Sequence, residues 1–415
     1  FIDGGTIAAT GTGVPPPEMT AQECVDCYGD LLTPGAIDCH VHTRDPGLTH
    51  KGDIASETTA ARAGGVTSIL DMPNTVPQTT TMALVHAKMK RAAEVAKANY
   101  AFFIGAAGTS NFDELAHADY RIIPGIKLFM GSSTGNMLVD KDDDLRRIFD
   151  LAASMDVIIV VHAEDEEIIA ENRAIISAIY GNAEVPVRVH CKIRPAEACL
   201  RATERAIALA RQYGTRLHIA HVSTADEAAL LSNEPLSPSK RITAEVSPHH
   251  LLWCAEEDGD NPRMKMNPAV KTAADREALR RAVVDGRIDI IATDHAPHLL
   301  SEKSGGALHA ASGAPMVQYS VPAMLGLFDP TTVVRLMCHN PAQLYGIQRR
   351  GVIAPGMYAD IARIRRVTPY TVHDADVVSR CAWTPLDGRT LRYRIIDTWL
   401  NGSRHGKAMP LEFAR

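Results

Sequence analysis

The sequence lacks the features of a membrane protein. It contains no run of ~18 consecutive apolar residues, the length that a membrane-spanning helix needs. No secretory signal peptide is visible, and the chain begins at Phe1 without a methionine, so we expect some N-terminal residues to be missing. It also lacks a basic run, and its net charge is −6 from 43 basic and 49 acidic residues. We therefore predict a cytoplasmic protein that binds neither membranes nor nucleic acid.

Cysteine is also scarce. Eight cysteines in 415 residues are too few and too scattered for a disulfide scaffold. Cys24 and Cys27 form a single C-x-x-C pair without a second pair or a nearby histidine. We interpret this pair as structural, with redox chemistry or zinc binding as alternatives. A hydrophobic fraction of 46% and a charged fraction of 22% are typical of a globular protein, and the length predicts a large barrel or two domains.

Short apolar runs alternate with longer amphipathic stretches from Gly35 onward. Alternation of this kind predicts parallel βαβ units, and eight units in succession predict an α/β fold of the (β/α)8 TIM type over residues 35–345. A doubly wound sheet is the alternative, but no G-x-G-x-x-G motif follows the first strand. The expected strands are 35–42, 67–74, 100–108, 125–130, 157–164, 217–223, 242–251 and 288–297. The expected helices include 82–98, 141–153, 166–180, 196–212 and 273–285.

The two ends of the chain differ from this pattern. Residues 1–34 and 346–415 are rich in turn residues and short β-like segments. We predict that they pair into one discontinuous β-sandwich domain, with the barrel inserted between them.

Metal-ligating residue types occur at the ends of five expected strands. Each has an ordinary structural interpretation by itself, such as a buried histidine or a helix cap. In a barrel, however, the carboxyl ends of all strands meet at one rim, where active sites form. We therefore predict a metal centre there, and His249 and His250 are weaker candidates for it. The residues at the five strand ends are His40 and His42, Lys127, His162, His221, and Asp294.

Lys127 needs a separate explanation because an ammonium group repels cations. Burial lowers the pKa of a lysine, and the neutral amine can add carbon dioxide. The resulting carbamate is in effect a carboxylate that can bridge two divalent cations. We therefore predict two divalent metal ions, with zinc favoured by the nitrogen and oxygen ligands, and an N6-carboxylated Lys127.

Several motifs together resemble the amidohydrolase superfamily, and within it the dihydroorotases. They are His40-Val-His42-Thr-Arg44-Asp-Pro-Gly, Asp71-Met-Pro-Asn74-Thr, Lys127-Leu-Phe-Met-Gly-Ser-Ser-Thr-Gly-Asn and Asp294-His-Ala-Pro-His298. Many dihydroorotases that are otherwise most similar carry an aspartate near the fourth strand, whereas the lysine matches the hydantoinase-like branch and one dihydroorotase branch. The resemblance extends over nearly the whole chain.

The resemblance implies specific roles for the candidate residues. His40 and His42 would bind the more buried metal together with Asp294. His162 and His221 would bind the second metal, and carboxylated Lys127 would bridge the two. Asp294 would also carry the proton during interconversion of dihydroorotate and N-carbamoyl-L-aspartate, a step of pyrimidine biosynthesis.

Five residues are expected to bind this small-molecule substrate. Arg44 suits the ring carboxylate because a guanidinium can pair with it through two hydrogen bonds, although a structural ion pair is the alternative. The others are Asn74, Asn267, His298 and Gly313, the last in a segment (301–315) expected to cover the site.

Other activities remain possible within this superfamily. A dihydropyrimidinase, hydantoinase or allantoinase would act on rings that lack the carboxylate. In dihydropyrimidinase-like relatives a tyrosine usually lies five residues after the bridging lysine, and that position is Ser132 here. A non-catalytic dihydroorotase-like scaffold is the third possibility, but such proteins typically lose metal ligands. A homo-oligomer is also possible.

Overall fold

A closed parallel barrel forms the centre of the molecule. The computed structural model describes residues 1–17, 19–132 and 137–414. Within these residues every strand of the barrel pairs in parallel with the next. The strands are β4 (Ala36–Val41), β5 (Val66–Asp71), β6 (Asn99–Phe102) with β7 (Ile104–Gly105), β8 (Ile126–Phe129), β9 (Ile158–His162), β10 (Arg216–Ile219), β11 (Ile242–Val246) and β12 (Ile290–Ile291).

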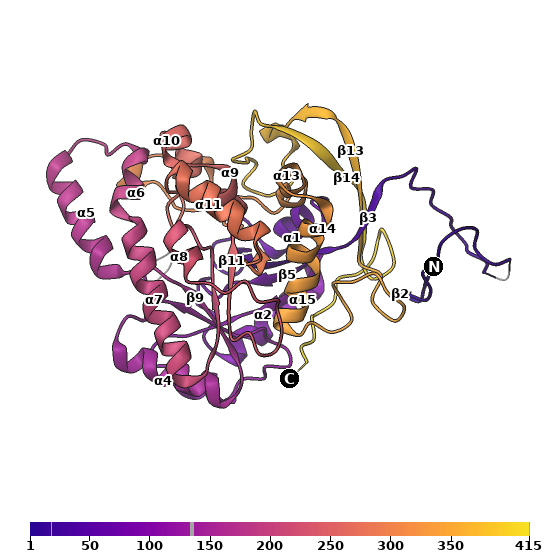
Figure 1. Ribbon diagram of the computed structural model, residues 1–415, viewed down its shortest axis with the longest axis horizontal. Helices are drawn as coiled ribbons and strands as arrows, with labels where there is room; N and C mark the ends of the chain where they lie inside the picture. The colour runs from indigo at the N-terminus through magenta and orange to yellow at the C-terminus, as the bar shows by residue number, and fades with distance from the viewer. Residues whose placement is uncertain (18, 133–136, 415) are drawn as a thin grey trace.

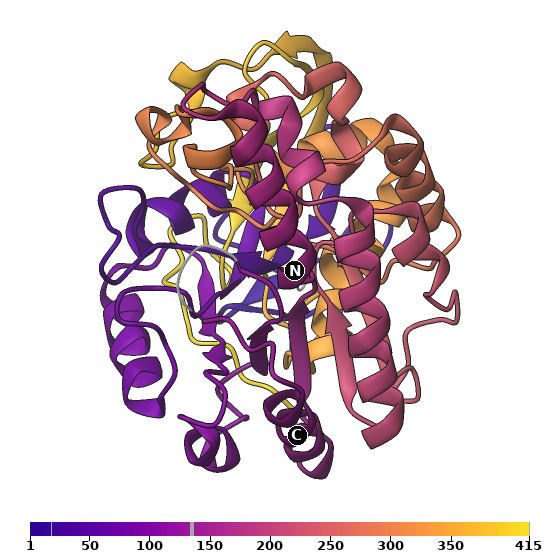
Figure 2. The same cartoon turned by 90° about the vertical axis from the view of Figure 1, so that its left-hand side faces the viewer.

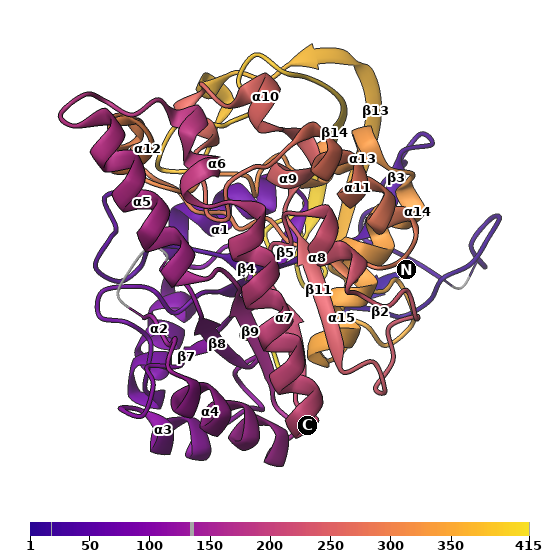
Figure 3. The same cartoon turned by 60° about the vertical axis from the view of Figure 1, so that its left-hand side comes forward.

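Contacts between the last and first strands close the barrel. Val41 bridges His295 in parallel, the His42 N–H donates to the His295 carbonyl at 2.8 Å, and the His295 N–H donates to the His40 carbonyl at 3.2 Å. β6 and β7 occupy one strand position that is interrupted at Phe103. The (β/α)8 prediction is therefore confirmed, and Figures 2 and 3 show the helices surrounding the strands.

The helices begin where the sequence supplies caps. Asp53 caps α1 through a reciprocal capping box with Ser56, and three aspartates in the first turn of α4 complement its helix dipole. The helices are α1 (Ile54–Ala63), α2 (Met82–Val95), α3 (Phe112–His117), α4 (Asp142–Ser154), α5 (Glu166–Tyr180), α6 (His190–Ile193), α7 (Ala196–Tyr213), α8 (Ala225–Ala229), α9 (Pro248–Leu252), α10 (Ala255–Asp258), α11 (Ala273–Val284), α12 (Gly306–His309), α13 (Ser320–Leu327), α14 (Pro330–Val334) and α15 (Asn340–Tyr345). Within the described residues, none of them is long and apolar enough to cross a bilayer.

The predicted helices agree closely with these bounds, but several predicted strands were too long, and the strand expected over 288–297 comprises only Ile290–Ile291. The strand expected over 242–251 ends at Val246, and Pro248 begins α9. Proline suits the first turn of a helix because its missing N–H would be unpaired there anyway. His249 and His250 therefore lie on a short helix rather than on the strand.

The chain ends form a separate antiparallel sheet. β3 (Leu31–Pro34) pairs with β13 (Ile361–Thr371), which pairs with β14 (Thr390–Trp399), and β1 (Ile2–Asp3) pairs with β2 (Thr6–Ile7). In Figure 1 this sheet lies on the side of the molecule opposite α5 and α7. The predicted pairing of the two chain ends is confirmed, whereas the exact domain boundaries, at 34/35 and 345/346, stay a prediction.

Candidate active site

An irregularity in β4 turns both histidines of the His-x-His motif toward the site. Ile37 and Cys39 belong to the apolar cluster at the bottom of the barrel. The pairing of β4 with β5 shifts register between Asp38 and Val41. Such a bulge re-aims the side chains that follow it. His40, although it comes directly after Cys39, therefore faces the strand ends together with His42.

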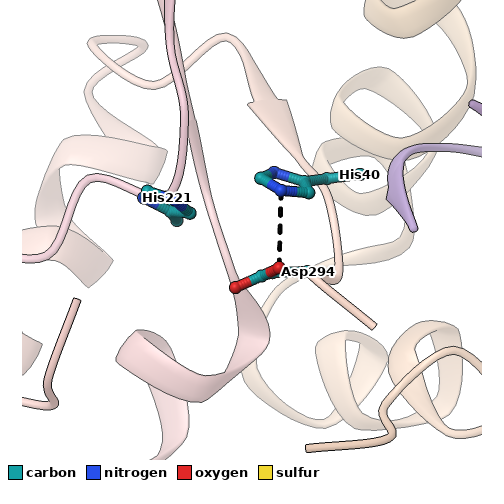
Figure 4. A group of neighbouring side chains, drawn as sticks. All are labelled: His40, His221 and Asp294. Atoms are coloured by element: carbon teal, nitrogen blue, oxygen red, sulfur yellow. Dashed lines mark ion pairs between the residues drawn. The ribbon is translucent and has the colours of Figure 1, made fainter. Parts of the chain in front are cut away.

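His40, His42 and Asp294 meet at the rim of the barrel. Asp294 Oδ1 lies 3.0 Å from His42 Nε2 and 3.4 Å from His40 Nε2. His221 approaches the same point: one ligand atom each from His40, His221 and Asp294 lies within 4.8 Å of the others (Figure 4). Burial alone would raise the pKa of Asp294, but His40 and His42 hold that pKa well below its ordinary value. Asp294 is therefore ionised at neutral pH.

The outer partners of these histidines suit metal binding. His40 Nδ1 lies 2.5 Å from Glu245 Oε1, and His42 Nδ1 lies 2.7 Å from Asn74 Oδ1. Glu245 and Asn74 therefore hold the Nδ1 sides of the two rings, and both Nε2 atoms point toward Asp294. Burial lowers the pKa of His42 to about 4, so its ring is neutral. A carboxylate and two ring nitrogens that converge in this way fit a cation between them.

A second pair of histidines lies beside the first. His162 ends β9 and His221 follows β10, and His162 Nδ1 lies 2.9 Å from His221 Nε2. The outer nitrogen of His162, Nε2, lies 2.9 Å from Glu164 Oε2. Burial lowers the pKa of both histidines, so both rings are neutral and available as ligands. The ring centroid of His221 is also 5.3 Å from that of His40, so the two histidine pairs form one continuous cluster.

Lys127 lies on β8 beneath this cluster. Its side chain is fully buried, and among the described residues no hydrogen-bond partner contacts its Nζ. Burial lowers the pKa of Lys127 to about 8, although Glu245 and Asp294 partly oppose this effect. A buried amine with a lowered pKa and no hydrogen-bond partner among the described residues fits conversion to a carbamate once cations offset the charge of the nearby carboxylates. Residues 133–136 of the predicted lysine motif lie outside the described residues.

Arg44 and His298 lie together beyond the metal-ligand candidates. Arg44 is 2% exposed, its Nε donates to the Pro297 carbonyl at 3.0 Å, and its Nη2 lies 3.1 Å from His298 Nε2. Gly313 packs against them: a Cβ at that position would lie 2.8 Å from Ala296 Cβ and 3.2 Å from His298 Cδ2. Its backbone, at φ 130°, also favours glycine.

Asn267 occupies a neighbouring wall. Its Oδ1 accepts from His190 Nε2 at 3.0 Å. The adjoining backbone is tied to the covering segment, because the Gly313 N–H donates to the Lys265 carbonyl at 2.9 Å. Buried Lys303 reinforces this link by donating to the carbonyls of Lys265, Ala311 and Gly313, each at 2.8 Å.

Several residues of the site had no role in the sequence analysis. Glu245 orients His40 from β11, and Glu164 pairs with Arg194 beside His162. Lys51 contacts His298. Glu164 alone had a visible signal, since it follows the strand-end histidine by two residues. The others lie on different elements from their partners, so no sequence spacing indicated them.

Comparison with known proteins identifies the family. The amidohydrolase family model matches residues 31–402. The chain belongs to the amidohydrolase family, an enzyme family that is generally metal-dependent, and it is a hydrolase. More particularly, it is 34% identical to a dihydroorotase of Halobacterium salinarum over 93% of this chain and 88% of that protein. It is also 32% identical to a dihydroorotase of Pelobacter propionicus over 97% of this chain and 93% of that protein.

Solved structures share the fold. The L-hydantoinase (dihydropyrimidinase) from Arthrobacter aurescens superposes with a TM-score of 0.91 at 27% identity, covering 100% of this chain and 93% of that chain. A dihydropyrimidinase from Brevibacillus agri gives a TM-score of 0.87 at 23% identity, with 100% and 95% covered. The second likeness concerns the fold alone.

Proposed function

We propose that the protein is a dihydroorotase, which interconverts dihydroorotate and N-carbamoyl-L-aspartate. The observation that carries this proposal is Arg44, which is buried beside the candidate metal ligands and forms no ion pair with any described residue. A buried charge without a counter-ion is costly, and a carboxylate matches the guanidinium fork best. Dihydroorotate carries such a carboxylate on its ring, whereas dihydrouracil and hydantoin carry none.

The proposal includes two divalent cations, most simply zinc. His40 and His42 hold one cation with Asp294, and His162 and His221 hold the other. Lys127, once carboxylated, would supply an anionic oxygen ligand to the cations. The convergence of the His40 and His42 Nε2 atoms on Asp294 supports this assignment, as does the buried amine of Lys127, which has no hydrogen-bond partner among the described residues. Nitrogen and oxygen ligands of this kind suit zinc.

The side chains supply proton transfer and orientation. When bound, the two cations would lower the pKa of a water molecule and polarise the ring carbonyl. Asp294, ionised because of its low pKa, takes the proton of the attacking water and returns it to the leaving ring nitrogen. Arg44 fixes the ring carboxylate. The residues that complete the substrate site are Asn74, Asn267, His298 and Gly313.

A hydantoinase or dihydropyrimidinase is the second candidate, favoured by the close structural likeness to L-hydantoinase. Such an enzyme would act on an uncharged ring and would not need the buried Arg44. A cytoplasmic location and a homo-oligomeric state remain predictions alongside these activities.

One experiment separates these possibilities. The purified protein is analysed for metal and assayed on dihydroorotate, dihydrouracil, hydantoin and allantoin. We expect about two zinc ions per chain, preference for dihydroorotate, and loss of activity on chelation that added zinc restores. Preference for an uncharged ring would refute the dihydroorotase proposal, and full activity without metal would refute the metal assignment. A protein that binds no metal and turns over none of the four substrates would be the non-catalytic scaffold.

A further inference from the structure

Lys51 contacts His298, a residue of the proposed carboxylate site, at the ring nitrogen that does not face Arg44. It lies in the loop between β4 and α1 and is 8% exposed. Its Nζ lies 3.1 Å from His298 Nδ1 and 2.9 Å from Glu302 Oε1. His298 follows β12, and Glu302 lies on the short helical turn Leu300–Lys303. Lys51 therefore joins the first and last loops of the barrel at the ring that adjoins Arg44.

This contact decides which nitrogen of His298 carries the proton. An ammonium group can only donate hydrogen bonds, so His298 Nδ1 accepts from Lys51 in the tautomer that carries its hydrogen on Nε2. The Nε2–H then points to the Ser312 carbonyl, 3.1 Å away. Burial and the nearby charges of Arg44 and Lys51 lower the pKa of His298, so the ring is neutral and has a single N–H.

The result is a pair of donors without a common acceptor. Arg44 Nη2, also a donor, lies 3.1 Å from the same His298 Nε2. Two N–H groups that adjoin in this way cannot bond to each other, and because the Ser312 carbonyl already accepts from His298, a carboxylate beside them would accept chiefly from Arg44. The opposite tautomer would remove this opportunity. With the proton on Nδ1, His298 would donate toward Glu302 Oε2, now 3.6 Å away, and Nε2 would accept from Arg44.

We propose that Lys51 is a positioning residue for the substrate carboxylate: by donating to His298 Nδ1, it commits the single N–H of His298 to Nε2 and to the Ser312 carbonyl, so that His298 cannot accept from Arg44 and the Arg44 Nη2–H stays available to the substrate. This inference rests on the proposed function. Lys51 does not touch the substrate itself. Its contribution is to hold the ring of His298 in the tautomer that selects an anion.

The first test observes the ring directly. Zinc-loaded protein with ¹⁵N-labelled histidine is compared with Lys51→Met by NMR without substrate, and His298→Gln assigns the His298 signals. We expect an Nε2–H tautomer in the original protein and a shift to Nδ1–H in Lys51→Met. Lys51→Arg, which still donates, should retain Nε2–H. An unchanged tautomer in Lys51→Met would overturn the inference.

The second test measures specificity. Lys51→Met should raise KM for dihydroorotate by roughly 10- to 100-fold, the effect of losing about one charge-assisted hydrogen bond, while kcat changes little. The kcat/KM for hydantoin should fall much less, Lys51→Arg should recover most of the loss, and exposed Lys90→Met serves as the matched control. Equal losses on both substrates would mean that Lys51 only supports the structure. If the original protein prefers hydantoin, the proposed function fails, and the ring spectra still decide whether Lys51 sets the tautomer.

Discussion

Replacement of Arg44 by methionine tests the substrate assignment most directly. Methionine keeps much of the apolar volume of arginine but provides no donor and no charge. If the guanidinium binds the ring carboxylate through two hydrogen bonds, the substitution removes both. A hydrogen bond to a charged group contributes about 1.5–3 kcal/mol, and each 1.4 kcal/mol is about tenfold. The kcat/KM for dihydroorotate should therefore fall by on the order of 10²- to 10⁴-fold.

The structure also predicts an effect that has nothing to do with the substrate. Arg44 Nε donates to the Pro297 carbonyl at 3.0 Å, so Arg44→Met leaves that carbonyl without its donor. An unpaired buried acceptor costs about 1–3 kcal/mol, and the loop between Asp294 and His298 would shift. This disturbance acts on every substrate alike. The informative quantity is therefore the ratio of kcat/KM for dihydroorotate to kcat/KM for hydantoin or dihydrouracil, measured with the metal content verified.

Arg44→Lys provides the matched comparison, because it keeps the charge but loses the fork geometry. We expect its ratio to lie between those of the original protein and Arg44→Met. The reasoning would be refuted if Arg44→Met lowered activity on charged and uncharged rings equally. In that case Arg44 would support the loop through Pro297, and the buried charge would need another explanation.

Four further outcomes follow from the site. Lys127→Ala should lose bound metal and activity, with partial rescue by a short carboxylate in the buffer; retained metal would contradict a bridging role. Because the pKa of Lys127 is lowered from 10.5 to about 8, the neutral fraction of its amine rises with pH through about 8. Carbamate formation in metal-free protein, followed by ¹³C NMR at constant dissolved carbon dioxide, should therefore increase with a midpoint near pH 8 rather than near pH 10. Asp294→Asn should lower kcat by ~10²- to 10⁴-fold with metal retained, and a much smaller loss would assign the proton to another group. His249 is buried, and neither of its ring nitrogens has a hydrogen-bond partner among the described residues. His249→Leu should therefore raise the free energy of unfolding by about 1–3 kcal/mol in denaturant titrations. A lower free energy of unfolding would mean that His249 makes a bond not evident in the structure.

Much of the fold followed from local sequence patterns. Strands buried on both faces are short and almost entirely apolar, and helices between them carry a period of 3.6 residues, so both signals are strong in a barrel. The expected helices 141–153 and 166–180 agree with α4 and α5 within one residue at either end. The strand expected over 242–251 was too long because it ran past Ser247 and Pro248, where the strand ends and α9 begins.

The contacts at the site are also of two kinds: some follow from the sequence pattern, and others depend on packing after the barrel has closed. His40, His42 and Asp294 could be grouped from sequence because barrel topology brings all strand ends to one rim. The contacts of Glu245 with His40 and of Lys51 with His298 join residues 205 and 247 positions apart. Neither contact follows from a periodic pattern, because it depends on which side chain fills a particular space after the barrel has closed. The register shift in β4 is of the same kind, since it depends on the pairing with β5.

The two parts of the site are built from different elements, which explains how one barrel can suit different rings. The candidate metal ligands occupy β-strand ends or the residues next to them, where closure of the barrel fixes their positions. The proposed carboxylate site lies instead on loops: Arg44 and Lys51 come from the loop after β4, and His298 and Gly313 follow β12. Loops can change without disturbing the strands.

A TM-score of 0.91 to an L-hydantoinase is therefore compatible with a different substrate, because the overall superposition is dominated by the barrel, whereas the substrate ring is selected by a few loop residues. We therefore expect the charged loop residues, rather than the likeness of the barrels, to determine the substrate. Arg44 and Lys51 both adjoin His298, and Lys51 is already paired with Glu302.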